Sequence, residues 1–141
     1  EIFSVDPRKI DWIGEDDFKK SETFKRTPTA DLEISINSKE KIRIEMQSGF
    51  TGINDIKQHK VLEAKKIFRE RKVHTMAIHF DLYNGQAAFL KLDAIEDDDA
   101  HWITRIHDDS TTVLNIDHNY FCWDVTRNPP NISNIYEKYE L

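Results

Sequence analysis

The alternation of apolar and polar residues is clearest between Thr27 and Gln47, TPTADLEISINSKEKIRIEMQ. A period of two places successive residues on opposite faces of a strand, so this stretch predicts a β-hairpin. Both arms can turn their apolar residues to one core face only if the numbers of directly paired residues have an even sum. The three-residue loop Asn37-Ser38-Lys39 satisfies this condition, whereas a two-residue loop shifts the register by one. The apolar positions of the two arms are Leu32, Ile34 and Ile36, then Ile42, Ile44 and Met46.

This register puts two carboxylates side by side on the polar face of the hairpin. Asp31 comes opposite Glu45, and Gln47 stands two residues further along the same row. Like charges in such positions repel each other unless positive charge, most often a divalent cation, lies between them. The alternative is a pair of exposed sheet carboxylates, each beside a Lys or Arg such as Arg43. The pattern alone leaves both interpretations open.

Two helices are predicted around the hairpin. The first runs from Glu15 to Arg26, and Pro28 ends it. The second runs from about Ile53 to Arg71, where apolar residues follow the 3.6-residue period. Lys57 and Lys60 fall on or beside its apolar stripe, so they either extend toward the polar face of the hairpin or snorkel outward to solvent.

The second half of the chain predicts further strands. Val73 to Leu82 is apolar on both faces, which is typical of a central strand, and Asn84-Gly85 favours a type I′ turn into a returning strand from Gln86 to Leu92. Edge strands are expected at Val113–Ile116 and Tyr120–Val125, and a short helix or tail at Ile132–Leu141. The fold class is therefore α+β (α/β-like), with a mixed β-sheet, one main packed helix and a central apolar strand.

Composition sets the broad class. The 141 residues suit one domain, 1–141, and since the chain starts at Glu1 we expect a processed or trimmed protein, or a domain of a longer one. There is no apolar run of about 18 residues, so no membrane span is expected. The single Cys122 excludes an internal disulfide and fits a cytoplasmic location. The net charge of -6 is uneven: residues 1–72 carry 16 Lys/Arg against 14 Asp/Glu, so basic residues can still converge on a polyanion.

The order of these elements resembles the PD-(D/E)xK nuclease superfamily, which includes restriction endonucleases. Its pattern falls on Asp31, Glu45 and Gln47, followed by a helix and an apolar strand, and it covers roughly Thr27 to Leu92. Two departures are visible. Pro28 stands three residues before the Asp instead of directly before it, and Gln47 replaces the usual Lys. A minority of restriction endonucleases use Glu-x-Gln here, and in others a catalytic residue has moved to the adjoining helix, for which Lys57 and Lys60 are the candidates.

The resemblance implies a Mg²⁺-dependent DNA endonuclease of the restriction type. Asp31 and Glu45 would bind the metal, and Gln47 would orient the attacking water. Lys57 or Lys60 would contact the scissile phosphate or that water. Since Mg²⁺ prefers a few hard oxygen ligands, the Met46 carbonyl is the expected third protein ligand.

The same resemblance implies DNA as the partner and a homodimer, since each subunit would cut one strand. The turn after Gln47 leads into the predicted helix N-terminus and would contact the DNA backbone. The DNA-binding residues predicted on this basis are Ser48, Thr51, Asn54, Lys57 and Lys60.

The histidines do not form a recognised metal pattern. His101, His107 and His118 stand among aspartates without zinc-type spacing, which favours an ordinary polar surface, while His59, His74 and His79 are expected to be structural. Two alternatives to the nuclease remain. One is a non-catalytic nucleic-acid or protein-binding module that keeps the nuclease fold, and the other is an interaction domain whose acidic half contacts a basic partner.

Overall fold

The computed structural model describes residues 1–13, 30–96, 102–107 and 110–139. Within them, six strands form a main sheet in the order β1-β2-β3-β5-β6-β9, and three form a smaller sheet in the order β4-β8-β7. The predicted helix from Glu15 to Arg26 lies outside the described residues. No helix in the described part is long and apolar enough to cross a bilayer.

The main sheet is mixed, as predicted. Its strands are β1 (Ile10–Trp12), β2 (Leu32–Ser35), β3 (Lys41–Gly49), β5 (His74–Asp81), β6 (Gln86–Lys91) and β9 (Phe121–Asp124). β3 and β5 pair in parallel, and the other neighbours pair antiparallel. A parallel pair needs a crossover connection, and α1 (Gln58–Arg71) supplies it. The α+β class, with one main helix and a central apolar strand, is confirmed.

The predicted hairpin register is confirmed for the paired residues. Leu32 pairs with Ile44 and Ile34 with Ile42, and the Ile36 N–H bonds the Glu40 carbonyl across the loop Asn37-Ser38-Lys39. Ile34, Ile42 and Ile44 are buried as predicted, whereas Ile36 and Met46, at the ends of the two apolar rows, are exposed. Burial of one apolar row on each arm therefore fixed the register as expected.

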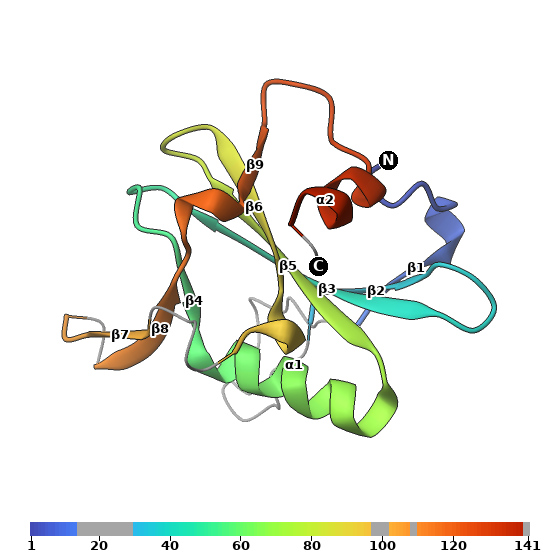
Figure 1. Ribbon diagram of the computed structural model, residues 1–141, viewed down its shortest axis with the longest axis horizontal. Coiled ribbons are helices and arrows are strands. Elements are labelled where there is room, and N and C mark those ends of the chain that lie inside the picture. The colour runs from blue at the N-terminus through green and yellow to red at the C-terminus, as the bar shows by residue number, and fades with distance from the viewer. Residues whose placement is uncertain (14–29, 97–101, 108–109, 140–141) are drawn as a thin grey trace, which may run out of the picture.

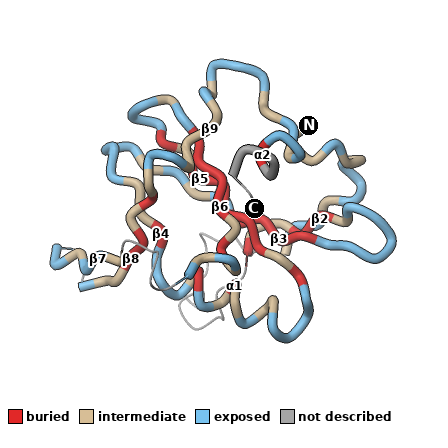
Figure 2. Tube along the Cα trace, in the orientation of Figure 1, coloured by how far each residue is buried: buried red, intermediate tan, exposed pale blue. Residues whose placement is uncertain are grey.

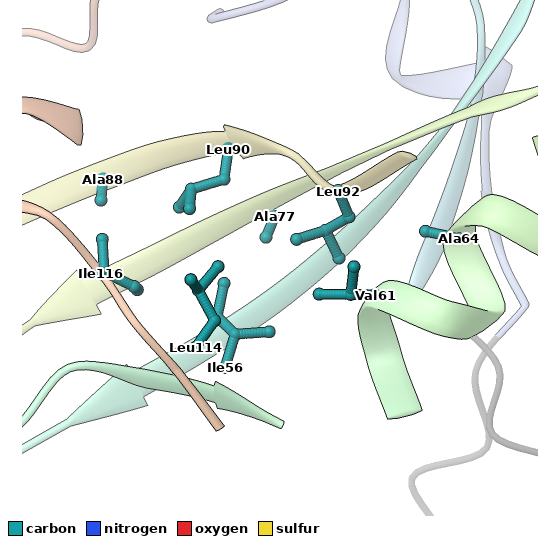
Figure 3. Close-up of a cluster of buried hydrophobic side chains, with 9 residues drawn as sticks. All are labelled: Ile56, Val61, Ala64, Ala77, Ala88, Leu90, Leu92, Leu114 and Ile116. Carbon is teal, nitrogen blue, oxygen red and sulfur yellow. The ribbon is translucent and has the colours of Figure 1, made fainter. Parts of the chain in front are cut away.

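Two layers cover the main sheet. On one face, α1 and the smaller sheet of β4 (Asp55–Lys57), β7 (Trp102–Arg105) and β8 (Thr111–Asn115) close over a cluster that includes Val61, Ala77 and Leu90 (Figures 1 and 3). On the other face, α2 (Ile132–Tyr139) and the N-terminal segment pack on a cluster that includes Ile44, Met76 and Phe89. Figure 2 shows the buried positions gathered along β3, β5 and β6.

The main helix starts five residues later than predicted. Ile56 is fully buried in β4, where it pairs with Leu114 of β8, and Lys57 is the extended residue just before α1. The 3.6-residue pattern could not distinguish this short strand from a first helical turn, because a single buried Ile56 fits both periods. Lys57 therefore lies at the end of a strand, not on the helix.

The turn between β5 and β6 also differs from the prediction. Asp81 pairs with Gln86, which leaves a four-residue loop, 82–85, in place of a two-residue turn. Within this loop only Gly85 has a positive φ, at 69°. The Asp81 carboxylate accepts the N–H groups of Tyr83 and Asn84, each at 3.0 Å, and this side-chain turn replaces the type I′ geometry.

Candidate functional site

Asp31 stands at the start of β2 and is held against the edge of β3. Its Oδ2 accepts the Met46 N–H at 2.7 Å, and its own N–H donates to the Ile44 carbonyl at 3.0 Å. Ile44 is already the partner of Leu32, so Asp31 is one residue out of step with the ladder, as at a β-bulge. The described pairing ends before the predicted Asp31–Glu45 pair, and the Asp31 carboxylate instead binds the backbone beside Glu45.

Glu45 is buried beneath α1 with only 7% of its surface exposed. Its Oε1 lies 2.7 Å from Nζ of Lys60, which reaches down from the first turn of α1. Burial raises the pKa of Glu45, Lys60 opposes this rise, and the charges of Asp31 and Glu63 add to it. Glu45 is therefore not the exposed carboxylate of the second interpretation, although it does lie beside a lysine as that interpretation expected. Of the two alternatives for Lys60, the structure shows extension toward the polar face of the hairpin.

The polar row of the hairpin continues under α1 as a series of ion pairs. Arg43, 4% exposed, lies 3.6 Å from Glu63, and Glu33 contacts Lys41 and Arg71. The sequence suggested Arg43 as a partner of Asp31 or Glu45. In the structure Arg43 pairs instead with Glu63 of α1. Each buried charge faces an opposite one, which offsets the cost of removing it from water.

The side-chain nitrogen of Gln47 is hydrogen-bonded within the protein. Its Nε2 donates to the Asp55 carbonyl at 2.9 Å and lies 2.6 Å from Nδ1 of His79, its direct partner in the β3–β5 ladder. Nε2 of His79 lies 2.8 Å from Oδ1 of Asn54. Burial lowers the pKa of His79 despite the nearby Asp81 and Asp55, which keeps the imidazole neutral near neutral pH.

An open cavity of about 350 Å³ lies beside this row. Lys57, His59 and Lys60 supply its basic lining, while Gln47 and Asp55 lie on the β3 and β4 side. His59 is exposed there, and burial together with Lys60 and Lys57 lowers its pKa. The expectation of a structural role for His59 is not supported by its position, because its side chain faces solvent at the cavity.

The remaining predicted DNA-binding residues differ in their surroundings. Ser48 and Thr51 are exposed, and Ser48 lines the cavity. Asn54 is half-buried, and its amide bonds His79, Asp81 and the Gly52 carbonyl. Its side chain is engaged inside the protein, so its predicted DNA contact has no support from its surroundings.

The donor set fits a hard divalent cation. Oδ2 of Asp31 and Oε1 of Glu45 have protein partners, and among the described residues the other oxygen of each carboxylate has none. The Met46 N–H points to Asp31. Because the N–H and carbonyl of a strand residue point to the same side, the Met46 carbonyl also faces the Asp31 side of β3. Two carboxylates and one carbonyl suffice for Mg²⁺, which retains several waters. The described residues contain no cluster of three or more His, Cys, Asp or Glu side chains suited to a metal.

Two groups that shape the site were not predicted as site residues: Asp55 was not singled out, and His79 was expected only to be structural. Asp55 accepts two bonds from Arg105 of β7, at 2.9 and 3.0 Å, and one from Asn115 of β8, which ties β4 to the other two strands of the smaller sheet. His79 binds Gln47 directly. The available signal was a lone His within the apolar run Met76 to Phe80, since a buried polar group must find a partner.

Comparison of the chain with protein-family models, with curated proteins and with solved structures found no match.

Proposed function

We propose that this chain is a Mg²⁺-dependent endonuclease domain that hydrolyses DNA phosphodiester bonds, of the restriction type. One observation carries the proposal. Asp31, just before β2, binds the backbone of β3 at Met46, next to Glu45, and Lys60 contacts Glu45 and also lines an open cavity. Carboxylates that bind a metal next to cations that bind a phosphate form the combination that phosphodiester hydrolysis requires.

The carboxylates have a defined role in this proposal. Asp31 and Glu45, with the Met46 carbonyl, would hold the cation, which would supply charge stabilisation and a water of lowered pKa. The buried position of Glu45 keeps competing solvent away from one side of the site. Because the pKa of Glu45 is raised, cation binding must displace a proton more often than at an ordinary glutamate, so we expect cleavage to increase as pH rises through that pKa.

The cationic side chains have a second role. Lys60 contacts Glu45 at 2.7 Å and lines the cavity, so it can turn from the carboxylate to a phosphate oxygen when a cation binds at Glu45. Lys57 and His59 lie on the same lining. His59, with its lowered pKa, adds a neutral hydrogen-bonding group, whereas the two lysines would attract the DNA backbone although the chain as a whole has a net charge of -6.

A second candidate is a non-catalytic nucleic-acid or protein-binding module that keeps this fold. The ion pair itself favours it, because Lys60 neutralises Glu45 without any metal. Gln47 also lacks the charge of the usual Lys, and its amide nitrogen is engaged by Asp55 and His79.

Nicking of supercoiled plasmid over a Mg²⁺ titration tests the proposal. We expect cleavage that requires Mg²⁺ and that falls by at least about 100-fold in Asp31→Asn and in Glu45→Gln. Asp11→Asn, at an exposed carboxylate on β1, is the matched control and should retain full activity. DNA binding without cleavage, unchanged in both site variants, would contradict the enzyme and support the binding module.

The restriction-type interpretation includes a homodimer, since one subunit would cut each strand. Light scattering coupled to size-exclusion chromatography, with and without DNA, tests this part separately. A monomer that cleaves both strands in one encounter would contradict it.

A further inference from the structure

The amide nitrogen of Gln47 has no hydrogen left for a ligand. A side-chain amide carries two N–H donors. One bonds the Asp55 carbonyl, which can only accept, and this contact fixes which end of the amide is nitrogen. The second points to Nδ1 of His79 at 2.6 Å. Oε1 is therefore the remaining polar atom of Gln47, a residue that lines the cavity.

The donor to Nδ1 sets the tautomer of His79. Nδ1 must accept, so the proton of the neutral ring lies on Nε2. That proton has a suitable acceptor, because Nε2 lies 2.8 Å from Oδ1 of Asn54. The two contacts agree with each other, and the opposite tautomer would set two donors face to face at Nδ1.

Asn54 is oriented in turn by an ionised carboxylate. Its Nδ2 donates to Oδ2 of Asp81 at 3.1 Å, which directs Oδ1 toward His79. Burial raises the pKa of Asp81, but bonds from Asn84, Asn54 and the Tyr83 N–H outweigh it and hold the pKa below its usual value. Each hydrogen bond in the series therefore has one donor and one acceptor: Gln47 donates to His79, His79 to Asn54, and Asn54 to Asp81.

Packing leaves the His79 ring little freedom to turn. The residue is 2% exposed, and the edge of its ring meets Phe121 at 6.3 Å between centroids. On another side lies Gly49, where an added Cβ would stand 3.6 Å from Cε1 of His79 and 3.2 Å from the Ile53 carbonyl. A side chain at Gly49 would therefore press on the backbone just before Asn54.

We propose that His79 is a positioning residue: it holds the amide nitrogen of Gln47 and so presents Oε1 as a hydrogen-bond acceptor for a water molecule in the cavity. This assignment rests on the proposed function for the identity of that water as the nucleophile. A water that donates one hydrogen to Oε1 has its lone pairs directed elsewhere, including toward a phosphorus atom held beside the basic lining. Gln47 would orient the water without taking its proton, which its amide cannot do.

The first test does not depend on catalysis. Long-range ¹H–¹⁵N correlation spectra of the whole chain report which ring nitrogen of His79 carries the proton. We expect an unprotonated Nδ1 and a protonated Nε2 at neutral pH, and the same spectrum in Asp31→Asn. A proton on Nδ1, in either a neutral or a charged ring, would overturn the proposal whether or not the protein cleaves DNA.

The second test separates positioning from simple packing. His79→Leu removes the acceptor, whereas His79→Asn can place a side-chain oxygen where Nδ1 stood. Under single-turnover conditions with Mg²⁺ and plasmid DNA, we expect cleavage to slow by about 100-fold in the Leu variant and to be largely restored in the Asn variant. In a Gln47→Ala background, His79→Leu should cause no further loss.

The outcomes distinguish the two levels of inference. Equal losses in the Leu and Asn variants, or a further loss in the Gln47→Ala background, would show that His79 acts through packing and would overturn the positioning role. If the wild-type chain cleaves no DNA at any Mg²⁺ concentration, the proposed function fails, and the tautomer spectrum alone then decides whether His79 fixes the orientation of Gln47.

Discussion

Nζ of Lys60 lies 2.7 Å from Oε1 of Glu45, and this contact joins the first turn of α1 to the middle of β3. Glu45 is buried and Lys60 is partly exposed, with 23% of its side-chain surface accessible. The lysine is therefore placed to balance a buried charge and to move into the cavity that it also lines. Stability and the proposed chemistry both depend on this pair.

Removal of the lysine should destabilise the fold. In Lys60→Met the Glu45 carboxylate loses its partner while it stays buried, and we expect a loss of about 2 kcal/mol in the free energy of unfolding. Urea denaturation at neutral pH measures this loss. The matched control is Lys57→Met, at an exposed position, which should change stability by less than about 0.5 kcal/mol. Equal effects of the two substitutions would contradict a structural role for the ion pair.

The pH dependence of stability should report the raised pKa of Glu45. A carboxyl whose pKa is raised in the folded state binds its proton more tightly there, so it stabilises the fold at low pH. This contribution is fully present below the ordinary value of 4.5 and is lost as pH rises through the raised pKa. Glu45→Gln cannot titrate, so its stability relative to the wild type should increase over that window. A difference that is constant with pH would mean that the pKa of Glu45 is not raised.

Two glycines with positive φ provide a paired test of two loops, one before β4 and one between β5 and β6. Gly52 has φ +80° and Gly85 has φ +69°, so Ala at either position should cost about 1–2 kcal/mol of backbone strain. A Cβ at Gly52 would stand 3.3 Å from Cδ1 of Tyr83, whereas nothing lies within 4 Å at Gly85. Because Tyr83 is 70% exposed and can move, we expect similar losses in urea denaturation. A much larger loss in Gly52→Ala would show that Tyr83 is held firmly.

Replacement of the Gln47 amide by a carboxylate should favour the protonated form of His79. In Gln47→Glu the side chain can no longer donate to Nδ1 and instead attracts a proton there, so the pKa of His79 should rise from its lowered value. A pKa above the ordinary histidine value of 6.5 would stabilise the fold of the variant below pH 6.5, and this stabilisation would be lost as pH rises through the pKa of the variant. NMR titration of the His79 ring measures the shift. An unchanged pKa of His79 would contradict the contact between Gln47 and His79.

The hairpin could be predicted from sequence because burial of one face makes register a local property. Leu32–Ile44 and Ile34–Ile42 follow directly from a period of two. The same period states which residues share a face but not which element covers that face. For that reason the sequence did not predict that Arg43 and Glu45 would be buried beneath α1.

The surroundings of Gln47 could not be predicted because they come from segments far apart in the chain. Its partner His79 is 32 residues away, and the parallel pairing of β3 with β5 that joins them is set by the crossover through α1. The predicted start of α1, at about Ile53, was wrong, because Ile56 satisfies the helical and the strand pattern equally. Lys60 lies on the helix as predicted, but the periodic pattern left open whether its side chain extends to the hairpin or to solvent.

The central claim is that Asp31 and Glu45 together bind a divalent cation. The most direct measurement is a crystal structure with Mn²⁺ in place of Mg²⁺, because anomalous scattering locates Mn²⁺ independently of any assumed ligand. We predict one anomalous peak within about 2.0–2.3 Å of a carboxylate oxygen of each residue and of the Met46 carbonyl, with Nζ of Lys60 moved away from Glu45. The claim would be contradicted if no such peak appeared at saturating Mn²⁺. It would also be contradicted if the contact between Lys60 and Glu45 were unchanged.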